Sequence, residues 1–546
     1  MNMVEKEHLK SDLVKNNNYK VIIASAGLGN RLQGMTKILN KALISVAQKP
    51  VISYIIDKID PEIEIVIPVG YKAQYVIDYC QLAYPKRKFN FVVIDKYEGN
   101  GSGLGYSLLE CKKYLQCPFI FSSNDTIVLE DVPAPETNWV GYTDLVDNRQ
   151  YRSITIHDGW VDNLYGKGAE VESYAYIGLC GVKDYDIFWD EMESGASKGS
   201  IIIGESFGLR AVLKNGIKPI KFSWYDTGNI ESLTATRDYF ERDIEVNILD
   251  KEEEAIWFAN NSVIKFSTDK IFIANRLQRT KQLGNFIPRI TDSSENMYKY
   301  NWIEGEVLSK NPTLNKFKQF LEWIKNLWQP ISLSPNEEEK YNNLCIDFYK
   351  NKTETRINHL FKTAEMYDSV EIINGKNYQE VSSILNRVDW SLITNGQCVV
   401  FHGDLHFENI IVKKNNILDN DNEYSFCLLD WRQDFSGNVE YGDIYYDLAK
   451  LNHGLIISHD IINKNLFDIS KTGDIINFEF FRKQSVIKCQ EYFTEWIKTN
   501  GYDLHKIQIL TALVFINSSP LHHFPYNLLL YYQGKSMLAD TLGNNY

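Results

Sequence analysis

Residues 21–43, which read VIIASAGLGNRLQGMTKILNKAL, constrain the fold of the first half of the chain more than any other stretch. Residues 21–24 form a short apolar run rich in β-branched side chains, which is typical of a buried parallel strand. The run leads into residues 25–29, a loop with almost no side chains. Backbone N–H groups of such a loop can approach a phosphate closely, although glycine turns also follow strands in many α/β folds that bind nothing there.

Two basic residues follow this loop. Arg31 supplies a fixed, forked positive charge and Lys41 a mobile one. Together with Leu32 and the Lys-Ala-Leu triplet at 41–43, the stretch resembles the signature of the sugar-nucleotide nucleotidyltransferases, which carry G-x-G-x-R-L and then a lysine before a buried strand. The resemblance implies catalytic roles for Arg31 and Lys41. It also implies that the loop binds the nucleotide through Ala26, Gly27 and Gly29.

Length and composition limit the classes of function. A chain of 546 residues predicts several domains, and a hydrophobic content of 44% is ample for packed cores. The net charge of −13 and the pI near 5.4 argue against nucleic acid and anionic membranes as partners. A polyphosphate substrate therefore needs a local basic site and a metal ion. The eight cysteines include no C-x-x-C pair, which is typical of reduced cytosolic thiols.

The start of the sequence has no feature of a targeting segment. Residues 1–20 are charged and polar without an apolar core, so we expect neither a signal peptide nor an anchor. No apolar run approaches the roughly 18 residues that a membrane span needs. We therefore expect a soluble, cytoplasmic protein.

Strand-like and helix-like segments alternate from residue 50 to residue 122. The helical patterns cover 50–59, 74–83 and 105–114, and the strand patterns between them cover 64–69, 89–94 and 119–122. The alternation predicts an α/β fold with a mostly parallel sheet, and with the resemblance it indicates a Rossmann-like nucleotidyltransferase domain over residues 1–245. Ligands of such sheets gather beyond the carboxyl ends of the strands, where the glycine loop lies.

Residues 99–105, which read GNGSGLG, form a second glycine-rich segment. A flexible turn explains such a composition without any ligand. In the family that the chain resembles, the equivalent loop lies against the base and the ribose, where bulky side chains would clash. The resemblance therefore assigns nucleotide binding to Ser102 and Gly103.

Two aspartates are candidates for holding Mg²⁺. Asp125 follows the strand pattern at 119–122 directly, although a lone aspartate in such a place is usually a cap or turn residue. Asp226 lies in the sequence WYDTG at 224–228, which looks like the element that supplies the second metal carboxylate in the family. Two carboxylates with waters and substrate phosphates commonly hold Mg²⁺. The metal and the two basic residues would together neutralise the reacting phosphates.

Lys167 fits the family pattern only in part. The family places a glutamate–lysine pair here, with the glutamate on sugar hydroxyls and the lysine near the sugar phosphate. This chain keeps Lys167 but has Gly166 at the glutamate position, which argues against an ordinary pyranose 1-phosphate. We assign Lys167 to the substrate phosphate, and the alternative is a solvated loop lysine.

The pattern restarts after residue 245. Two strand patterns, a helix pattern at 272–283 and a further strand pattern outline a kinase small lobe, in which Lys265 is the nucleotide-binding lysine. The glutamate that normally pairs with this lysine is not obvious in the sequence. Either Gln278 or Asn275 substitutes for it, or the register of the helix differs.

Residues 399–410, which read VVFHGDLHFENI, have the spacing of a kinase catalytic loop. In such a loop, Asp404 would accept the proton of the acceptor hydroxyl and Asn409 would bind a metal ion. Asp430, in the sequence CLLDW, is a strand-end aspartate that can hold a second Mg²⁺. The complete set resembles the aminoglycoside phosphotransferase and choline kinase family. ATP and Mg²⁺ are the co-substrate and cofactor that this resemblance implies.

The second resemblance predicts a bilobal, protein-kinase-like domain over residues 246–546. We expect its small lobe at 250–310 and its large lobe at 311–546, with a mostly helical pattern over 311–393. Asp443 and Asp447 also match the family pattern, and for them we expect structural roles as a helix start and as loop anchors.

The two resemblances together indicate a bifunctional enzyme. The kinase half would phosphorylate a small hydroxylated acceptor with ATP, and the transferase half would join that phosphate to a nucleotide from an NTP. We expect a sugar or sugar-alcohol acceptor with a non-anomeric phosphate, CTP as the nucleotide, and a product used for capsule or surface polysaccharide. A shared chain would raise the local concentration of the intermediate.

Three alternatives stay open at this point. The enzyme could make CDP-choline from choline, or it could couple an anomeric sugar kinase to a transferase that uses UTP or dTTP. One half could instead be a degenerate binding or regulatory module, although the carboxylates of both sites are present. The partners expected are small molecules and neither nucleic acid nor membrane, and a homo-oligomer stays open.

Overall fold

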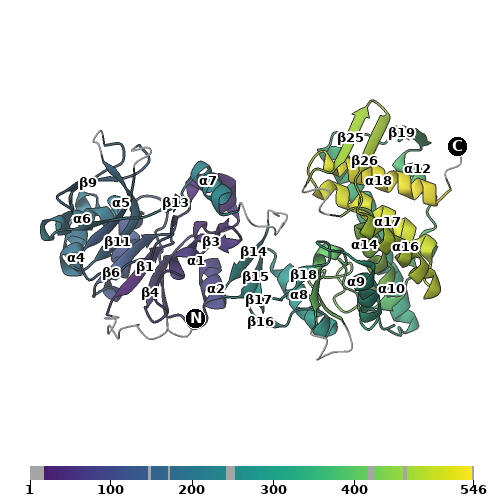
Figure 1. The fold of residues 1–546 in the computed structure, drawn as a ribbon, viewed down its shortest axis with the longest axis horizontal. Helices are drawn as coiled ribbons and strands as arrows, with labels where there is room; N and C mark the ends of the chain where they lie inside the picture. The colour runs from purple at the N-terminus through teal and green to yellow at the C-terminus, as the bar shows by residue number, and fades with distance from the viewer. Residues whose placement is uncertain are drawn as a thin grey trace, which may run out of the picture. The chain divides into compact units, whose positions relative to one another are not determined.

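The computed structural model describes residues 18–144, 149–169, 173–241, 253–415, 423–458 and 464–543. The chain forms two compact units, each of which has its own core (Figure 1). Unit 1 comprises the described residues of Met1–Thr268 together with Asp292–Lys299. Unit 2 comprises those of Asp269–Thr291 and Tyr300–Tyr546.

A mixed sheet forms the central layer of unit 1. Its parallel strands are β1 (Lys20–Ala24), β4 (Ile65–Val69), β5 (Phe89–Val93) and β6 (Phe119–Ser123), in the order β6-β1-β4-β5. The sheet continues through β8 (Trp139–Thr143), β9 (Ser153–His157), β10 (Trp160–Tyr165), β11 (Tyr174–Val182) and β12 (Lys218–Lys221). Strand β11 pairs antiparallel with β6, β8 and β9.

The prediction of a mostly parallel sheet is therefore right for the first four strands and wrong for the sheet as a whole. The turn between β9 and β10 shows one physical reason. Asp158 and Gly159 both have positive φ, 48° and 80°, which suits the two-residue turn of a hairpin. Strands that a two-residue turn joins must run antiparallel.

Helices cover both faces of this sheet. They are α1 (Val51–Ile56), α2 (Ala73–Ala83), α3 (Leu104–Cys111), α4 (Tyr185–Ser194), α5 (Ser200–Ile203), α6 (Glu205–Val212) and α7 (Ile230–Phe240). Side chains of β1 alternate between two apolar clusters, because neighbouring residues of a strand point to opposite faces. Val21 and Ile23 join one cluster with residues of α1 and α2, and Ile22 joins the other with residues of α3, α4 and α6.

A hairpin that the sequence places in the kinase small lobe packs into unit 1. It consists of β14 (Glu254–Ala259) and β15 (Ser262–Ser267), joined by Asn260 and Asn261 with φ of 48° and 54°. The Trp257 side chain is fully buried in the same cluster as Tyr79, and its Nε1 donates to Ser45 Oγ at 3.1 Å. The compact units therefore divide later in the chain than the predicted boundary at 245, and the linker residues 242–252 lie outside the described residues.

Short elements also occur, and the last two strands among them include residues of both units. They are the strands β2 (Ser45–Val46), β3 (Lys49–Pro50), β7 (Thr126–Val128), β13 (Trp224–Asp226), β16 (Ile290–Ser293) and β17 (Met297–Asn301), and the 3-10 turns η1 (Asn30–Lys37), η2 (Lys41–Leu43), η3 (Lys112–Tyr114), η4 (Ala196–Lys198) and η5 (Leu213–Asn215). Strands β14, β15, β17 and β16 form a four-stranded sheet in that order.

Unit 2 is mainly helical. Its helices are α8 (Lys270–Leu283), α9 (Leu314–Ile324), α10 (Pro335–Ile346), α11 (Lys352–Thr363), α12 (Val381–Leu385), α13 (Trp390–Thr394), α14 (Ile444–Ile456), α16 (Gln484–Thr499), α17 (Leu504–Ser518) and α18 (Tyr526–Thr541). A π-helical turn, η7 (Asp347–Asn351), joins α10 to α11, and short turns lie at η6 (Gly284–Phe286), η8 (Phe407–Asn409) and η9 (Ser519–Leu521). The expectation of a mostly helical 311–393 region is thus confirmed.

Three small sheets accompany these helices. One contains β18 (Glu306–Val307), β22 (Ile410–Lys414) and β23 (Tyr424–Leu428), and a second contains β20 (Lys376–Tyr378), β19 (Glu371–Ile373), β26 (Ile475–Phe480) and β25 (Phe467–Thr472). The third pairs β21 (Cys398–Val399) with β24 (Gly442–Asp443). The predicted catalytic loop runs from β21 to β22.

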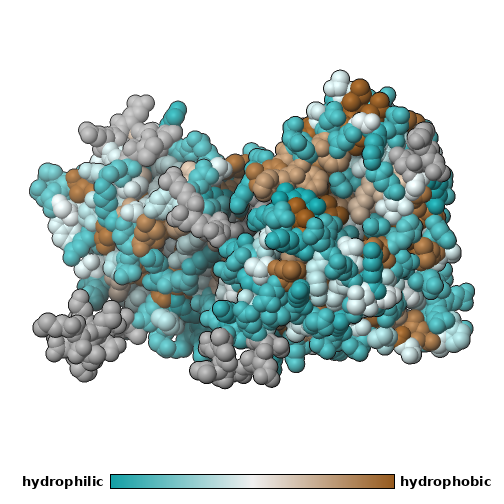
Figure 2. Space-filling model, turned by 45° about the vertical axis from the view of Figure 1, so that its right-hand side comes forward, coloured by the Kyte–Doolittle hydropathy of each residue, from teal (hydrophilic) through white to brown (hydrophobic). Residues whose placement is uncertain are grey.

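Hydrophilic residues cover most of the surface in view in Figure 2. Among the described residues, no helix combines the length and the apolar character needed to cross a membrane.

Candidate active sites

The two predicted metal carboxylates of unit 1 lie at neighbouring strand ends. Asp125 lies between β6 and β7, and Asp226 is the last residue of β13. Strands β7 and β13 pair antiparallel with Asp226 opposite Thr126, which brings the two aspartates together although 101 positions separate them in the sequence. The N–H of Thr227 donates to the backbone oxygen of Asp125 at 2.9 Å and holds the two segments in this register.

Gly228 shows how closely the charged groups converge. A Cβ atom built on Gly228 would lie 2.9 Å from both Asp125 Oδ2 and Asp226 Oδ1, and 3.3 Å from Arg31 Nη2. A side chain larger than hydrogen would displace these groups. Steric crowding therefore explains why the WYDTG segment has glycine at this position. The Gly228 N–H also donates to Asp226 Oδ1 at 2.9 Å.

Positive charge surrounds Asp125. Lys41 Nζ contacts Asp125 Oδ2, Ser123 Oγ donates to Asp125 Oδ1, and Arg31 Nη2 lies 3.8 Å from Oδ2. Burial alone would raise the pKa of Asp125, but these contacts outweigh it and lower the pKa to about 2. At neutral pH this carboxylate is therefore ionised.

Asp226 has the opposite shift. Burial, followed by the negative charge of Asp125, raises the pKa of Asp226. Tyr151 Oη donates to Asp226 Oδ2 at 3.0 Å and partly compensates for this. Two neighbouring carboxylates are a ligand set that suits Mg²⁺, which usually takes one or two carboxylates and completes its shell with waters and phosphates. No group of three or more His, Cys, Asp or Glu side chains suited to a metal occurs among the described residues.

The glycine loop positions Lys41. The η2 turn begins at Lys41, and its cap residue Asn40 donates to the backbone oxygens of Ser25, at 3.1 Å, and Tyr71, at 2.6 Å. Gly29 has φ of 70°, and a Cβ there would lie 3.1 Å from Lys41 Cβ and 2.9 Å from Thr36 Cγ2. The loop thus packs directly against the base of the lysine side chain.

The other two predicted loop residues differ in exposure. The backbone oxygen of the buried Ala26 accepts a hydrogen bond from Tyr71 N at 3.0 Å. Gly27 is exposed and has no atom within 4 Å of a built Cβ. Open space at Gly27 is compatible with a ligand against the backbone of the loop.

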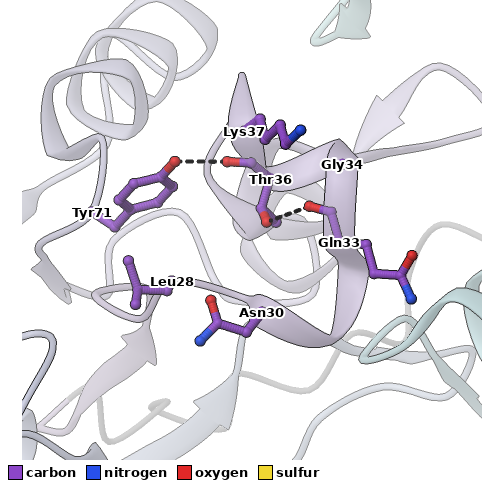
Figure 3. Close-up of a pocket in the computed structure, with 7 residues that line it drawn as sticks. All are labelled: Leu28, Asn30, Gln33, Gly34, Thr36, Lys37 and Tyr71. Carbon is purple, nitrogen blue, oxygen red and sulfur yellow. Dashed lines mark hydrogen bonds between the residues drawn. The ribbon is translucent and has the colours of Figure 1, made fainter.

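A pocket of about 540 Å³ borders this loop (Figure 3). Residues that line it come from the loop, from η1 and from the end of β4, and they are Leu28, Asn30, Gln33, Gly34, Thr36, Lys37 and Tyr71. Tyr71 Oη donates to the backbone oxygen of Thr36 at 2.9 Å and closes one side of it. None of the predicted site residues lines this pocket.

The second glycine segment has a packing explanation. A Cβ at Gly103 or Gly105 would overlap the backbone oxygens of Ile201 and Ser200 in α5, so these glycines let α3 approach α5. Ser102 closes a turn, because its Oγ donates to the oxygen of Gly99 at 2.7 Å. Nucleotide binding by Ser102 and Gly103 stays a prediction.

Lys167 shares the electrostatic environment of the two aspartates. Its pKa is lowered, first by burial and then by the positive charges of Arg31 and Arg152, while Asp125 and Asp226 act in the opposite direction. A Cβ built on Gly166 meets nothing within 4 Å, so the glutamate of the family pattern is replaced by open space.

Sequence reasoning missed Tyr151, Arg152 and Glu205 in this part of unit 1. Arg152 Nη1 lies 3.2 Å from Oε1 of the buried Glu205. Tyr151 and Arg152 lie between strands and belong to no motif with a fixed spacing, so the sequence contains no signal that would have found them.

The predicted kinase-like site of unit 2 centres on Asp404. Lys450 Nζ of α14 lies 2.7 Å from Asp404 Oδ1, and His406 Nε2 lies 3.5 Å from Oδ2. Asn409 Nδ2 donates to the backbone oxygen of Asp404 at 2.9 Å. Burial would raise the pKa of Asp404, but Lys450 and His406 hold it well below its ordinary value. Lys450 is a partner that the sequence did not reveal, because it lies 46 positions away.

Asp447 supports the turn of this catalytic loop. Its carboxylate accepts from the N–H groups of His402, at 2.7 Å, and Gly403, at 2.6 Å, and from Trp328 Nε1 at 3.0 Å. Asp443 caps the start of α14 by accepting from Tyr445 N. Both contacts agree with the structural roles that we expected for these aspartates.

Helix α8 contains Gln278 and Asn275, the two residues that the sequence offered as partners of Lys265. The helix turns Arg276 and Arg279 into the interior of unit 2, while Gln278 is exposed and Asn275 is partly buried. Arg276 Nη1 lies 3.0 Å from Asp430 Oδ1, and Arg279 donates to the backbone oxygens of Phe401 and Arg432. The inward positions are therefore basic and contact the predicted metal aspartate and the catalytic loop. Lys265 is buried on β15 of unit 1, whereas Asp404, Asn409 and Asp430 belong to unit 2.

Comparisons with known proteins concern the N-terminal part of the chain. No family model matches the chain. It is 26% identical over 262 residues to the bifunctional protein GlmU of Methanococcus vannielii, a match that covers 45% of this chain and 60% of that protein. It is 38% identical over 109 residues to the choline-phosphate cytidylyltransferase of Streptococcus pneumoniae, which covers 19% of this chain and 44% of that protein. The chain thus spans less than two thirds of the length of these curated relatives.

Solved structures of two cytidylyl-transferring enzymes also resemble this chain. The CTP:phosphocholine cytidylyltransferase of Streptococcus pneumoniae has 18% identity and a TM-score of 0.33, over 41% of this chain and 99% of that one. The inositol-1-phosphate CTP transferase of T. maritima has 13% identity and a TM-score of 0.34, over 42% of this chain and 99% of that one. The similarities in sequence by themselves support a nucleotidyltransferase-like fold for the N-terminal part.

Proposed function

We propose that unit 1 transfers a nucleotidyl group from an NTP, with CTP favoured, to the phosphate of a small phosphate monoester. In the same proposal, unit 2 makes that monoester by phosphorylating a sugar or sugar-alcohol hydroxyl with ATP. The product is an NDP-linked building block, with capsule or surface polysaccharide as its destination. The observation that carries the proposal is the convergence of Asp125, Asp226 and Arg31 beside Gly228, with Lys41 in contact with Asp125.

The proposed transferase step depends on charge. The attacking phosphate oxygen and the α-phosphate of the NTP are both anionic, so the reaction is slow until positive groups lie between them. Asp125 and Asp226 would hold Mg²⁺, which neutralises charge on the triphosphate and orients it. Lys41 and Arg31 supply further positive charge, and Lys167 would bind the acceptor phosphate. The bond to pyrophosphate then breaks as the new phosphate–phosphate bond forms.

The proposed kinase step uses the catalytic loop of unit 2. Asp404 would orient the acceptor hydroxyl and accept its proton, while Asn409 and Asp430 would hold Mg²⁺ on the phosphates of ATP. Two observations support a kinase activity of unit 2: the kinase-like motifs in the sequence and the contacts of Asp404 with Lys450, His406 and Asn409.

CDP-choline synthesis is the second candidate. The similarity to the choline-phosphate cytidylyltransferase of Streptococcus pneumoniae favours it, and the same similarity supports CTP as the nucleotide. The absence of a side chain at Gly166 fits either candidate better than a pyranose 1-phosphate.

The experiment that tests the proposal is a mass-spectrometric screen of the full chain. Phosphorylated sugars, phosphorylated polyols and phosphocholine are each offered with each of the four NTPs, and the unphosphorylated compounds are offered with ATP. We expect an NDP-linked product from a phosphate monoester and its loss on addition of EDTA. The absence of any such product over the whole panel would contradict the transferase assignment.

A further inference from the structure

A group of basic side chains lies near the catalytic loop of unit 2, and the proposed reaction does not account for all of them. Lys450, Arg432, Lys352 and Arg356 form this group, which we call the basic cluster. Lys450 is paired with Asp404 at 2.7 Å. The side chain of Arg432 packs against the catalytic loop, since a Cβ at Gly403 would lie 2.5 Å from Arg432 Cβ and 3.2 Å from Arg432 Cδ.

The aromatic ring of Phe348 contacts two members of the cluster, Lys352 and Arg432. Lys352 Nζ lies 4.0 Å and Arg432 Cζ 4.9 Å from the centroid of the Phe348 ring. Phe435 stacks on the same ring with centroids 4.3 Å apart, and Tyr446 contacts it edge to face with centroids 4.6 Å apart. The Phe348 ring therefore brings two positive charges to one place.

The backbone at this point is unusual. Phe348 lies in the π-helical turn η7, and Lys352 is the first residue of α11 directly after it. Single π-helical turns are rare and are frequently found at functional sites. Arg356 follows Lys352 by four positions and thus lies on the same face of α11.

Two members of the cluster, Lys352 and Arg356, have no carboxylate partner among the described residues. Among the described residues, neither the Lys352 ammonium nor the Arg356 guanidinium contacts a carboxylate or a hydrogen-bond acceptor. Asp434 lies nearby, but its carboxylate accepts from Gly437 N at 2.9 Å, and Arg432 Nε donates to the backbone oxygen of Asp434 at 3.1 Å. Burial, followed by the charges of Arg432, Arg356 and Lys450, lowers the pKa of Lys352 well below its ordinary value.

Such an arrangement costs free energy unless an anion joins it, because these side chains are partly buried and like charges repel more strongly where contact with water is reduced. We propose that the basic cluster binds a carboxylate or phosphate group of the acceptor, so that the kinase-like half phosphorylates a hydroxylated acid. A neutral polyol would leave the cations unpaired, and the positive charge of choline would be repelled. This inference rests on the proposed kinase function and replaces a neutral sugar or sugar-alcohol with an acceptor that also carries an anionic group.

The reaction balances with ATP as the phosphoryl donor. The acceptor hydroxyl oxygen attacks the γ-phosphorus, the bond from that phosphorus to the β,γ-bridging oxygen breaks, and ADP leaves. The hydroxyl proton passes to Asp404 and then to solvent. The anionic group of the acceptor takes no part in the bond changes and serves only to bind and orient.

Matched acceptors test the proposal with the full chain, ATP and Mg²⁺. One series compares glycerol, D-glycerate and glycerol 3-phosphate, a second compares glucose, gluconate and glucose 6-phosphate, and choline represents a cation. ADP release and the mass of the product are measured. We expect turnover of acids in at least one series, with kcat/KM on the order of 10²-fold above the neutral member, and none with choline. The carboxylate and phosphate members distinguish the two kinds of anion.

Substitutions in the basic cluster test whether Lys352 and Arg356 bind the acidic group of the acceptor. Lys352→Met and Arg356→Met should each raise the KM for the acid on the order of tenfold and leave the KM for ATP unchanged. Lys362→Met is the matched control, since Lys362 is exposed on the same helix, and it should change neither value. A rise in the KM for ATP alone would assign the cluster to the phosphates of ATP and overturn the proposal.

The remaining outcomes separate this inference from the proposed function. Equal or better turnover of neutral or cationic acceptors would leave the kinase assignment standing and overturn the inference. If no compound is phosphorylated, the kinase assignment fails, and calorimetry with inorganic phosphate and D-glycerate decides the inference. Binding that Lys352→Met abolishes and Lys362→Met preserves would support an anion site, and no binding would overturn it.

Discussion

The two candidate sites centre on the same kind of ion pair in opposite surroundings. Asp125 contacts Lys41 in unit 1, and Asp404 contacts Lys450 in unit 2. In unit 1 a second carboxylate, Asp226, lies close enough for the charge of Asp125 to raise its pKa. In unit 2 the pair lies among additional cations that no carboxylate contacts. The first surroundings suit a divalent cation, and the second suit an anionic group of a substrate.

The comparison shows that an ion pair alone does not indicate the ligand of a site. Burial opposes ionisation of both aspartates, and a lysine offsets that cost in both. The further charged groups differ between the sites: Asp226 and Arg31 add one charge of each sign in unit 1, whereas the groups of the basic cluster in unit 2 add positive charge only. Such groups come from distant elements, so each prediction below changes one of them or removes the pair.

The largest effect should come from Asp404→Asn. The change removes the group that orients the acceptor hydroxyl and accepts its proton, so turnover should fall on the order of 10³-fold while ATP binding is largely kept. The full-length variant should still make the NDP-linked product when it is given the pre-formed phosphate. Formation of that product from the unphosphorylated acceptor would show that unit 2 does not supply unit 1.

Asp125→Asn and Asp226→Asn test the carboxylate pair of unit 1. Each should lower NTP consumption by about 10²–10³-fold, because one ligand of the proposed metal is lost, and should leave ATP-dependent phosphorylation unchanged. Steady-state assays of both activities on the same preparation make the comparison. Loss of both activities from either change would contradict the assignment of separate sites.

A fragment series tests where unit 1 ends. A fragment that ends at residue 241 lacks the fully buried Trp257, and it should be less stable than one that ends at residue 268, by about 3–5 kcal/mol if the exposed core does not rearrange. Chemical unfolding of the two fragments measures the difference. Equal stability would mean that the hairpin β14–β15 adds nothing to the core of unit 1.

His402 should make unit 2 sensitive to acid. Its Nε2–H donates to the oxygen of Leu429 at 2.8 Å and its Nδ1 accepts from Asp404 N at 3.2 Å, so a second ring proton would meet an N–H donor. Burial, with Arg279 and His406, lowers the pKa of His402 to about 3. The unfolded chain binds more protons than the folded one between pH 6.5 and 3, so stability falls as the pH falls through this window.

The free energy of unfolding should fall by about 3–5 kcal/mol between pH 7 and pH 3 because of His402. Thermal unfolding of the wild type and of His402→Gln over this pH range checks it, because glutamine cannot take up the proton. A variant that loses stability with acid as steeply as the wild type would assign the sensitivity to other groups.

The smallest effect should come from Gly29→Ala. The positive φ of Gly29 and the short distances from a built Cβ to Thr36 and Lys41 predict a loss of about 1–2 kcal/mol in the free energy of unfolding. Gly27→Ala is the matched control, since a Cβ there has open space, and it should be nearly neutral. Denaturant unfolding compares the two, and equal losses would contradict the role of Gly29 in seating Lys41.

Much of the fold followed from local patterns. The strands and helices between residues 50 and 122 were found close to their predicted bounds, because alternation of apolar runs and glycine turns is a short-range signal. The antiparallel extension of the sheet did not follow from it, since strand direction depends on which strands meet and not on any one segment. The hairpin β14–β15 has strand propensity in any context, and only packing of Trp257 decided which unit it joins.

The sequence by itself predicted the candidate carboxylates of both sites, because Asp125 directly follows a strand pattern and Asp226 and Asp404 lie in recognisable motifs. Only the tertiary structure decided which charges face them. Tyr151 reaches Asp226 across 75 positions of the chain, and the basic cluster draws on α11, α14 and the segment after β23. Electrostatic interactions act through space, so residues that interact can be far apart in the sequence and show no fixed spacing.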